Sequence, residues 1–255
     1  MKTRFFSRFS LPLLAASTLL ASCNKNDSAP EPGSLAIEID HLVGNTPLKL
    51  NTGTYTNGLG QPFTVSTFNY YLSNIKLGKA DGTEYAEPES YRLIKESDTS
   101  TKTFTLENVP AGDYTSLSFT IGVDSARNVA GAQTGALDPT NGMFWSWNSG
   151  YIYTKLEGSS PAAGGNQQLL FHIGGFKSPN NTIRIASPSL NGAVLQVRKD
   201  RTPAVHLAAD VQKMFTGPHV IDFSKLSNTM GGSNSVLVAD NQAVGMFRVD
   251  HVHAN

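Results

Sequence analysis

Short segments of β-forming residues recur along the chain from Ser34 onward, and clusters of Gly, Pro, Asn and Asp separate them. In the first segment, Leu35, Ile37 and Ile39 stand at every second position, which is typical of a strand with one buried face. Residues 63–77 are rich in β-branched and aromatic side chains, which indicates a long or bent strand. Many short strands of this kind predict an all-β fold, specifically an antiparallel β-sandwich with long loops.

The same pattern predicts further strands, over residues 103–106, 114–123, 151–156, 168–173, 182–186, 193–198 and 244–249. A hairpin turn is expected at residues 108–113, because Pro110 fixes φ and Gly112 tolerates a positive φ. Long loops are expected over residues 124–148 and 158–167, and loops of that length in a compact domain are usually functional or mobile.

Residues 208–215 (AADVQKMF) are the one segment with a helical pattern. Val211, Met214 and Phe215 have suitable spacing, and Gly217-Pro218 would end the helix. The sequence therefore predicts at most one short helix.

The first 33 residues are typical of an export signal and not of a folded element. Three basic residues precede an apolar stretch at 11–20, and Leu20-Ala21-Ser22-Cys23 follows. About ten apolar residues are too few to span a bilayer, which needs roughly 20. We therefore predict a lipoprotein signal peptide at 1–22, a lipid on Cys23, a flexible tether at 23–33 and a β domain at 34–255. The alternative is an ordinary secretory signal with an incidental cysteine.

Cysteine usage and charge exclude several kinds of chemistry. Cys23 is the only cysteine, and a lipidated Cys23 can form no disulfide and leaves no thiolate for catalysis or metal binding. Loss of residues 1–22 would remove three of the 20 basic side chains and none of the 20 acidic ones. The remaining net charge of −3 gives no electrostatic reason to expect a nucleic acid partner.

Recognisable catalytic motifs do not occur in the sequence. It contains no phosphate-binding loop, no HExxH, no GxSxG and no EF-hand loop, so we expect a protein that is not an enzyme. A hydrolase with a carboxylate pair drawn from Asp124, Asp138 and Glu157 stays an alternative, although nothing in the sequence brings these residues together. Loop carboxylates such as Asp124 would also suit calcium.

Two histidines near the C-terminus, His251 and His253, follow a predicted strand. In an extended chain they would share a face, with Cα atoms about 6.5 Å apart at about 3.3 Å per residue, so both imidazoles could reach one ion. Imidazole suits copper and zinc, and affinity in the divalent series peaks at copper. The alternative is a pair of solvated histidines on a frayed terminus.

The remaining histidines carry weaker signals. His41 ends the first strand, and His172 lies among apolar residues, where a histidine is more often a hydrogen-bonded core residue than a ligand. His206 and His219 are expected to be ordinary surface or loop residues.

Residues 141–151 (NGMFWSWNSGY) hold both tryptophans of the chain, Trp145 and Trp147. One interpretation is a packed aromatic loop, because Trp and Tyr bury large areas while keeping a polar edge. The other is an electron-rich indole near a metal, open to oxidation. The sequence by itself does not separate the two.

Several segments, in this order along the chain, resemble the MbnP-like proteins. They are the strand ending in His41, FNYYLSNIKL at 68–77, VPAGDY at 109–114, IGVD at 121–124, GMFWSWNSGY at 142–151, FHIGG at 171–175, and the ending from ADN at 239–241 to His251-Val252-His253. The similarity covers nearly the whole chain after the predicted signal, about residues 34–253.

The resemblance implies a periplasmic copper-binding protein in which histidines hold the copper. It also implies a tryptophan oxidised to kynurenine by a partner di-haem enzyme of the MauG type. Carried over to the matching positions, the candidate ligands are His41, His172, His251 and His253, and the candidates for oxidation are Trp145 and Trp147. This chain departs from close family members at Asn228, where they often have histidine.

Taken together, the expected protein is an exported lipoprotein that binds copper. Asn24 after the acylated cysteine gives no inner-membrane retention signal of the aspartate kind, so we expect the outer membrane. The competing hypothesis is a binding or assembly module on the cell envelope, whose histidines are structural and whose aromatic loops meet a protein partner.

Overall fold

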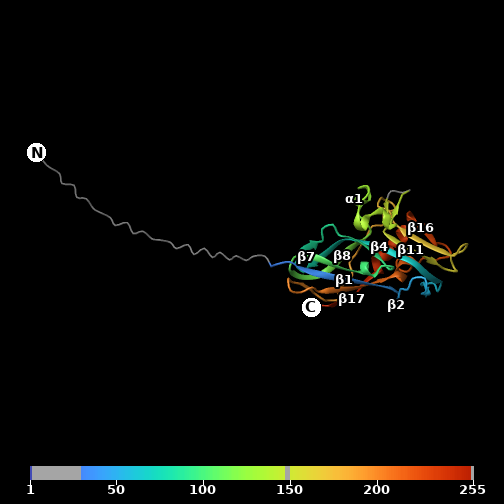
Figure 1. The fold of residues 1–255 in the computed structure, drawn as a ribbon, viewed down its shortest axis with the longest axis horizontal. Coiled ribbons are helices and arrows are strands. Elements are labelled where there is room, and N and C mark those ends of the chain that lie inside the picture. The colour runs from blue at the N-terminus through green and yellow to red at the C-terminus, as the bar shows by residue number, and fades with distance from the viewer. Residues whose placement is uncertain (2–29, 147–149, 254–255) are drawn as a thin grey trace.

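The computed structural model describes Met1 and residues 30–146 and 150–253. Strands dominate it and form two large curled sheets that face each other (Figure 1). The predicted all-β, sandwich-like fold is confirmed. Apart from Met1, the expected signal peptide lies outside the described residues, as does Cys23.

The first sheet has five strands. They are β1 (Gly33–Val43), β2 (Thr46–Pro47), β7 (Thr103–Val109), β15 (Ala204–Asp210) and β17 (Phe247–His253). Their order is β17-β15-β1-β2, with β7 also paired to β1, so β17 forms one edge of this sheet.

The second sheet has ten strands. They are β3 (Tyr55–Thr56), β4 (Pro62–Lys79), β5 (Glu84–Ala86), β6 (Tyr91–Lys95), β8 (Gly112–Ile121), β11 (Thr154–Ser159), β12 (Gln168–Ile173), β13 (Arg184–Ala186), β14 (Leu195–Val197) and β16 (Asn228–Met230). The main order is β13-β8-β4-β11-β12-β16, and a separate hairpin joins β9 (Phe144–Trp145) and β10 (Gly150–Tyr151). Strand β4 is long and bent, as predicted: its register against β8 shifts between Ser73 and Lys76, where Asn74 has a φ of 51°.

Two strand pairs depart from the antiparallel pairing of the predicted sandwich. Strands β1 and β15 run parallel, with Ile37 opposite Val205, and β12 and β16 also run parallel. Both parallel partners return to their sheets after long connections, and a parallel pair requires such a crossover. The predicted turn at 108–113 forms between β7 and β8, but Asn108 (φ 56°) takes the left-handed conformation instead of Gly112.

The main core lies between the two sheets. Alternate residues of β1 (Leu35, Ile37 and Ile39) are buried there, opposite apolar side chains of the ten-stranded sheet. A second, smaller cluster covers the other face of that sheet, beneath the loop before β9. Neighbouring residues of β4 divide between the two clusters, since Tyr70 belongs to the main core and Tyr71 to the smaller one. The molecule therefore has an apolar layer on both faces of the larger sheet.

Helical structure is sparse and does not lie where it was expected. The described helices are α1 (Ser125–Asn128) and α2 (Ser233–Gly245), with 3₁₀ turns η1 (Thr99–Lys102), η2 (Gly135–Leu137), η3 (Pro139–Asn141) and η4 (Val211–Met214). Within the described residues, no helix combines the length and the apolar character needed to cross a membrane.

The predicted helix at 208–215 is wrong. Residues 208–210 continue β15, and only η4 follows, with the Asp210 carboxylate accepting from the backbone N–H of Gln212. The longest helix is α2, whose last residues were predicted to begin a strand. The sequence of α2 shows no clear apolar periodicity because two buried positions carry amide side chains. Asn241 donates to two backbone carbonyls, and Gln242 donates to the Thr154 hydroxyl.

Candidate metal centre

Three imidazoles lie together on the outer face of the five-stranded sheet. His206 on β15 and His251 and His253 on β17 offer nitrogen atoms that all lie within 4.8 Å of one another. The neighbouring Val205 and Val249 point inward and are buried, so the histidines face solvent. We call this group the histidine trio.

A β-bulge places the trio on one face. Leu207 pairs with Val249, but His206 pairs with His251, so Asp250 is an extra residue in β17. In unbroken pairing His251 would lie opposite Val205 and point into the core. The bulge reverses the alternation, and as a result Asp250, His251 and His253 are all exposed while Val249 stays buried.

Two of the three imidazoles already have the separation of ligands on one ion. The Nε2 atoms of His251 and His253 lie 3.1 Å apart. With a metal–imidazole bond of about 2.0 Å, adjacent ligand nitrogens lie roughly 2.8–3.3 Å apart. This pair therefore fits a bound ion without rearrangement of the strand.

His206 is within reach of the same ion but must turn. Its ring stacks on His251 with centroids 4.1 Å apart and an interplanar angle of 15°. The lone pairs of stacked rings lie in parallel planes and do not converge on one point. His206 must therefore rotate about its side-chain torsions to share the ion. Its side chain is 18% exposed on the outer face, which gives it space to do so.

Carboxylates lie beside the Nδ1 atoms of two imidazoles of the trio. Asp250 Oδ2 lies 2.8 Å from His251 Nδ1 and accepts a hydrogen bond from its N–H, which leaves the Nε2 lone pair for a metal. This hydrogen bond lowers the pKa of Asp250. Glu38, opposite His206 in the parallel pair, has Oε2 3.6 Å from His206 Nδ1. Three imidazoles supported by carboxylates form a donor set that suits divalent copper or zinc.

His41 lies in the main core and not in the trio. Its Nδ1 is 2.8 Å from Glu96 Oε2, and its Nε2 is 2.8 Å from the Tyr70 hydroxyl. Because a carboxylate only accepts, Nδ1 carries the proton and Nε2 accepts from Tyr70. Burial lowers the pKa of His41, which favours this neutral form. The arrangement is that of a satisfied core histidine.

His172 also lies apart from the trio. It projects from β12 on the face of the ten-stranded sheet away from the main core, since its neighbours Phe171 and Ile173 point into that core. Its Nε2 donates to Glu157 Oε1 at 2.9 Å, and burial lowers its pKa. The structure thus joins only His251 and His253 of the four predicted ligands.

The third member of the trio, His206, was expected to be an ordinary surface residue. The signal that could have identified it is the alternation around it: its sequence neighbours Val205 and Leu207 are apolar and buried, so His206 points to the opposite, exposed face of β15. That inference requires recognising residues 204–210 as a strand, which the helix-like stretch after Leu207 conceals.

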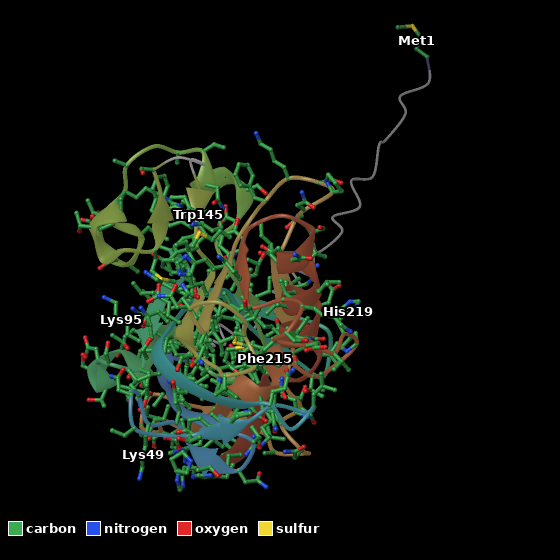
Figure 2. All side chains as sticks on the ribbon, turned by 90° about the vertical axis from the view of Figure 1, so that its right-hand side faces the viewer. Met1, Lys49, Lys95, Trp145, Phe215 and His219 are labelled. Carbon is green, nitrogen blue, oxygen red and sulfur yellow. The ribbon has the colours of Figure 1, made fainter. Side chains whose placement is uncertain are left out.

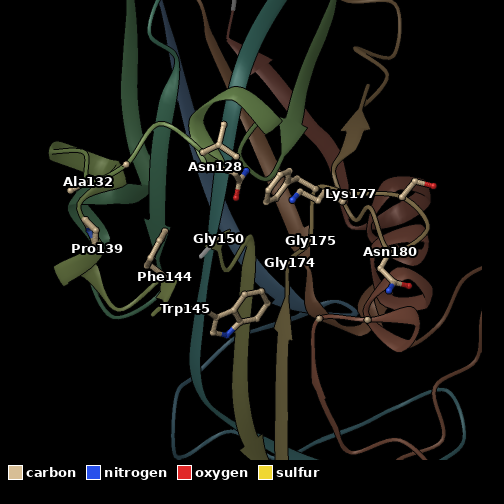
Figure 3. A pocket seen from close by; sticks show the side chains of 16 residues that line it. Asn128, Ala132, Pro139, Phe144, Trp145, Gly150, Gly174, Gly175, Lys177 and Asn180 are labelled. Atoms are coloured by element: carbon tan, nitrogen blue, oxygen red, sulfur yellow. The ribbon is translucent and has the colours of Figure 1, made fainter. Parts of the chain in front are cut away.

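Trp145, labelled in Figure 2, lies in the smaller cluster beyond the ten-stranded sheet, whereas the trio lies on β15 and β17 of the five-stranded sheet. Both sheets and the main core separate the two. The indole is 5% exposed and packs on Gly174, where an added Cβ would come within 2.8 Å of the ring. It lines a cavity of about 730 Å³ together with Phe144, Asn128 and Lys177 (Figure 3). Trp147, the other candidate for oxidation, lies outside the described residues.

Lowering the pH from roughly 7.5 to 5.5 is expected to reduce the free energy of unfolding. The pKa values of His41 and His172 are lowered in the folded protein. Below pH 6.5 the unfolded chain therefore binds protons at these imidazoles more readily than the folded protein does. This stability is complete above pH 6.5 and is lost as the pH falls toward the folded-state pKa values. Urea unfolding at several pH values measures it.

A non-titrating variant isolates the contribution of His41 to this slope. His41→Gln is expected to give a shallower dependence on pH, because one proton-binding group is removed. The Glu96 and Glu157 carboxyls, whose pKa values are also lowered on balance, contribute only below their ordinary 4.5 and do not interfere. An unchanged slope in His41→Gln would show that His41 does not titrate differently in the folded state.

Comparison with known proteins finds a matching family model and a solved structure of similar fold. The model of the MbnP family matches residues 32–234, which ends before His251 and His253. The solved structure of MbnP from Methylosinus trichosporium has a TM-score of 0.50 and 14% sequence identity, and the alignment covers 87% of this chain and 98% of that one. At this identity the likeness shows the fold alone. No curated protein matches the chain.

Proposed function

Because the chain belongs to the MbnP family, which is associated with copper, we propose that it is a copper-binding protein of the cell envelope. The observation that supports this proposal is the histidine trio. Three imidazole nitrogens lie within 4.8 Å of one another, and a site of this kind binds copper with the highest affinity among the divalent first-row metals. The proposed role is binding and not catalysis.

Each residue of the trio has its own role in the proposed binding of the ion. His251 and His253 supply the adjacent pair of Nε2 ligands, and His206 completes the set after its ring turns. Asp250 fixes the orientation and tautomer of His251 through the Nδ1 hydrogen bond. The bulge, which keeps all of these groups on the solvent face, leaves the remaining coordination positions open to water or to a partner.

The copper titration of the purified protein tests this function. After a chelator has removed bound metal, we expect one equivalent of copper per chain, bound more tightly than zinc, as the divalent series requires. Equilibrium dialysis with elemental analysis gives the stoichiometry. A protein that retains no copper under these conditions would favour the competing assembly-module hypothesis.

We also propose that a lipid on Cys23 anchors the domain, at the outer membrane. The support is the sequence pattern of residues 1–23 and the position of Gly33, where β1 begins ten residues later. Such a spacer would hold the sheets clear of the bilayer surface. Detergent partitioning of the wild type and of Cys23→Ser tests the anchor, since the variant should move to the aqueous phase.

The proposed tryptophan oxidation concerns a separate region. A MauG-like di-haem partner would convert Trp145 or Trp147 to kynurenine, and the cavity beside Trp145 supports access to that indole. Because both sheets separate Trp145 from the trio, we expect Trp145→Phe to leave copper binding by the trio unchanged within twofold. Peptide mass spectrometry of protein produced with and without the partner enzyme detects the modification.

A further inference from the structure

The cavity beside Trp145 has the size, the walls and the charge of a site for a small organic anion (Figure 3). We infer that it binds a planar carboxylate, an aromatic acid in which one ring system carries one negative charge. This inference goes beyond the proposed copper binding and does not depend on it, because no residue of the trio lines the cavity.

The volume and the side chains of the cavity suit a ring system. Its volume of about 730 Å³ lies within the roughly 300–1,000 Å³ of small-molecule sites. Three aromatic side chains line it, those of Phe144, Trp145 and Phe176. Aromatic rings that meet offset or edge-on attract each other beyond the gain from buried area alone. The walls therefore favour a flat aromatic ligand over an aliphatic one of the same size.

Glycine backbone forms the wall next to the indole. A Cβ on Gly174 would lie 2.8 Å from the Trp145 ring, and a Cβ on Gly231 would lie 3.7 Å from it. Gly231 and the following Gly232 have φ values of 82° and 77°, which residues with a side chain rarely adopt. All three glycines line the cavity, so this wall is bare backbone and leaves a flat space beside the indole.

Lys177 is the one charged side chain among the described residues that line the cavity. In Figure 3, Lys177 and Trp145 face the same space from two sides. The Lys177 ammonium forms no ion pair with a described carboxylate, and its contact is with the Phe176 ring, 5.3 Å from the ring centroid. A single cation in a cavity without acidic side chains attracts an anion, and the apolar walls strengthen this attraction by lowering the local dielectric constant. The site is therefore selective for a negatively charged ligand.

Two further polar side chains of the loop between β12 and β13 can hold the carboxylate. Ser178 and Asn180 line the cavity, and their side chains form no hydrogen bond with another described residue. Their hydroxyl and amide groups can donate to the ligand oxygens beside Lys177. Asn128 differs, because its amide nitrogen already donates to two backbone carbonyls and a buried tyrosine hydroxyl. We therefore assign the contacts with the carboxylate to the loop and not to Asn128.

Isothermal titration calorimetry of the purified, metal-free protein with 2-naphthoate tests the inference. We expect one equivalent to bind, with a dissociation constant of about 0.1–1 mM. Two matched probes separate the features of the ligand. The neutral 2-naphthamide and the saturated decahydro-2-naphthoate should each bind about tenfold more weakly or not at all. Equal binding of the amide would overturn the selectivity for an anion, and equal binding of the saturated acid would overturn the selectivity for a ring. No binding of 2-naphthoate would overturn the site.

Two variants test where the probe binds. Lys177→Met removes the charge and keeps the length of the side chain, so we expect about a tenfold loss of affinity for 2-naphthoate and less than a twofold change for 2-naphthamide. Ala132→Trp places a large ring in the cavity and should abolish binding of both probes. Lys177 and Ala132 are exposed, so both variants should fold, and urea unfolding checks this.

The matched control is Lys225→Met. The Lys225 side chain is 82% exposed, lies 3.4 Å from Asp222 and does not line the cavity, so its replacement should leave the affinity for 2-naphthoate unchanged. If Lys177→Met bound 2-naphthoate as tightly as wild type, the anion would not contact Lys177 and the inference would fail. Unchanged binding in Ala132→Trp would place the probe outside the cavity, with the same consequence.

Discussion

Cu(II) at about a hundredfold excess over its dissociation constant is expected to raise the free energy of unfolding by about 2.7 kcal/mol. The ion would join β17, an edge strand, to β15 through side chains of both strands, and the unfolded chain does not hold His206 beside His251 and His253. The double substitution His251→Ala/His253→Ala is expected to abolish this gain. Thermal and urea unfolding with and without Cu(II) measure it.

The double variant is suitable for this experiment because both side chains are on the surface. His251 and His253 are exposed, and their replacement removes no buried contact of the main core. The metal-free variant should therefore unfold at nearly the same urea concentration as the metal-free wild type. His219→Ala should keep the full stabilisation by Cu(II). If the double variant were stabilised as strongly as wild type, the ion would have to bind away from β17.

The part of this site that the sequence predicted depends on strand periodicity alone. Two histidines two residues apart share a face of any extended chain, and His251 and His253 do so here. Which face they share was not predictable in the same way. Simple alternation groups them with Val249, which is buried, and only the extra residue at Asp250 moves them to the solvent side. A bulge depends on the partner strand, which a single sequence does not specify.

The rest of the ligand set depends on contacts between distant segments. His206 joins the trio because β15 pairs with β17 across 45 positions of sequence, and no local pattern encodes that pairing. His41 is excluded because Glu96 and Tyr70, both far along the chain, occupy its two nitrogens. The resemblance to a family supplied candidate positions, but the packing of this particular chain determines which side chains meet.

The sequence predicted the fold better than the site, and the errors in the predicted strands have a common cause. β12 (Gln168–Ile173) has the predicted bounds because a short apolar run stands there between Gly165-Asn166 and Gly174-Gly175. β15 was missed because Ala208 and Ala209 are good helix formers, yet they lie between β1 and β17 and complete the sheet. Tertiary pairing overrides local preference at such positions, and the same override gives the two parallel pairs.

Replacing Phe215 by alanine is expected to cost about 3–5 kcal/mol of unfolding free energy. Phe215 follows η4 and lies in the middle of the molecule (Figure 2). It is 1% exposed, and its ring meets those of Phe63, Phe171 and Phe223 with centroids 5.5, 5.3 and 4.9 Å apart. The substitution would leave a cavity bordered by three buried rings. Phe63 lies on β4 and Phe171 on β12, so the walls of the cavity have little freedom to collapse.

Urea unfolding of Phe215→Ala gives this cost directly, and a neighbouring residue supplies the control. Val220 lies five residues further along the same connection and is 58% exposed, so Val220→Ala should change stability by less than about 0.5 kcal/mol. The comparison separates burial from position in the chain. A loss below about 1 kcal/mol in Phe215→Ala would mean that the aromatic cluster relaxes around the missing ring and that the core between the sheets is less tightly packed than these distances indicate.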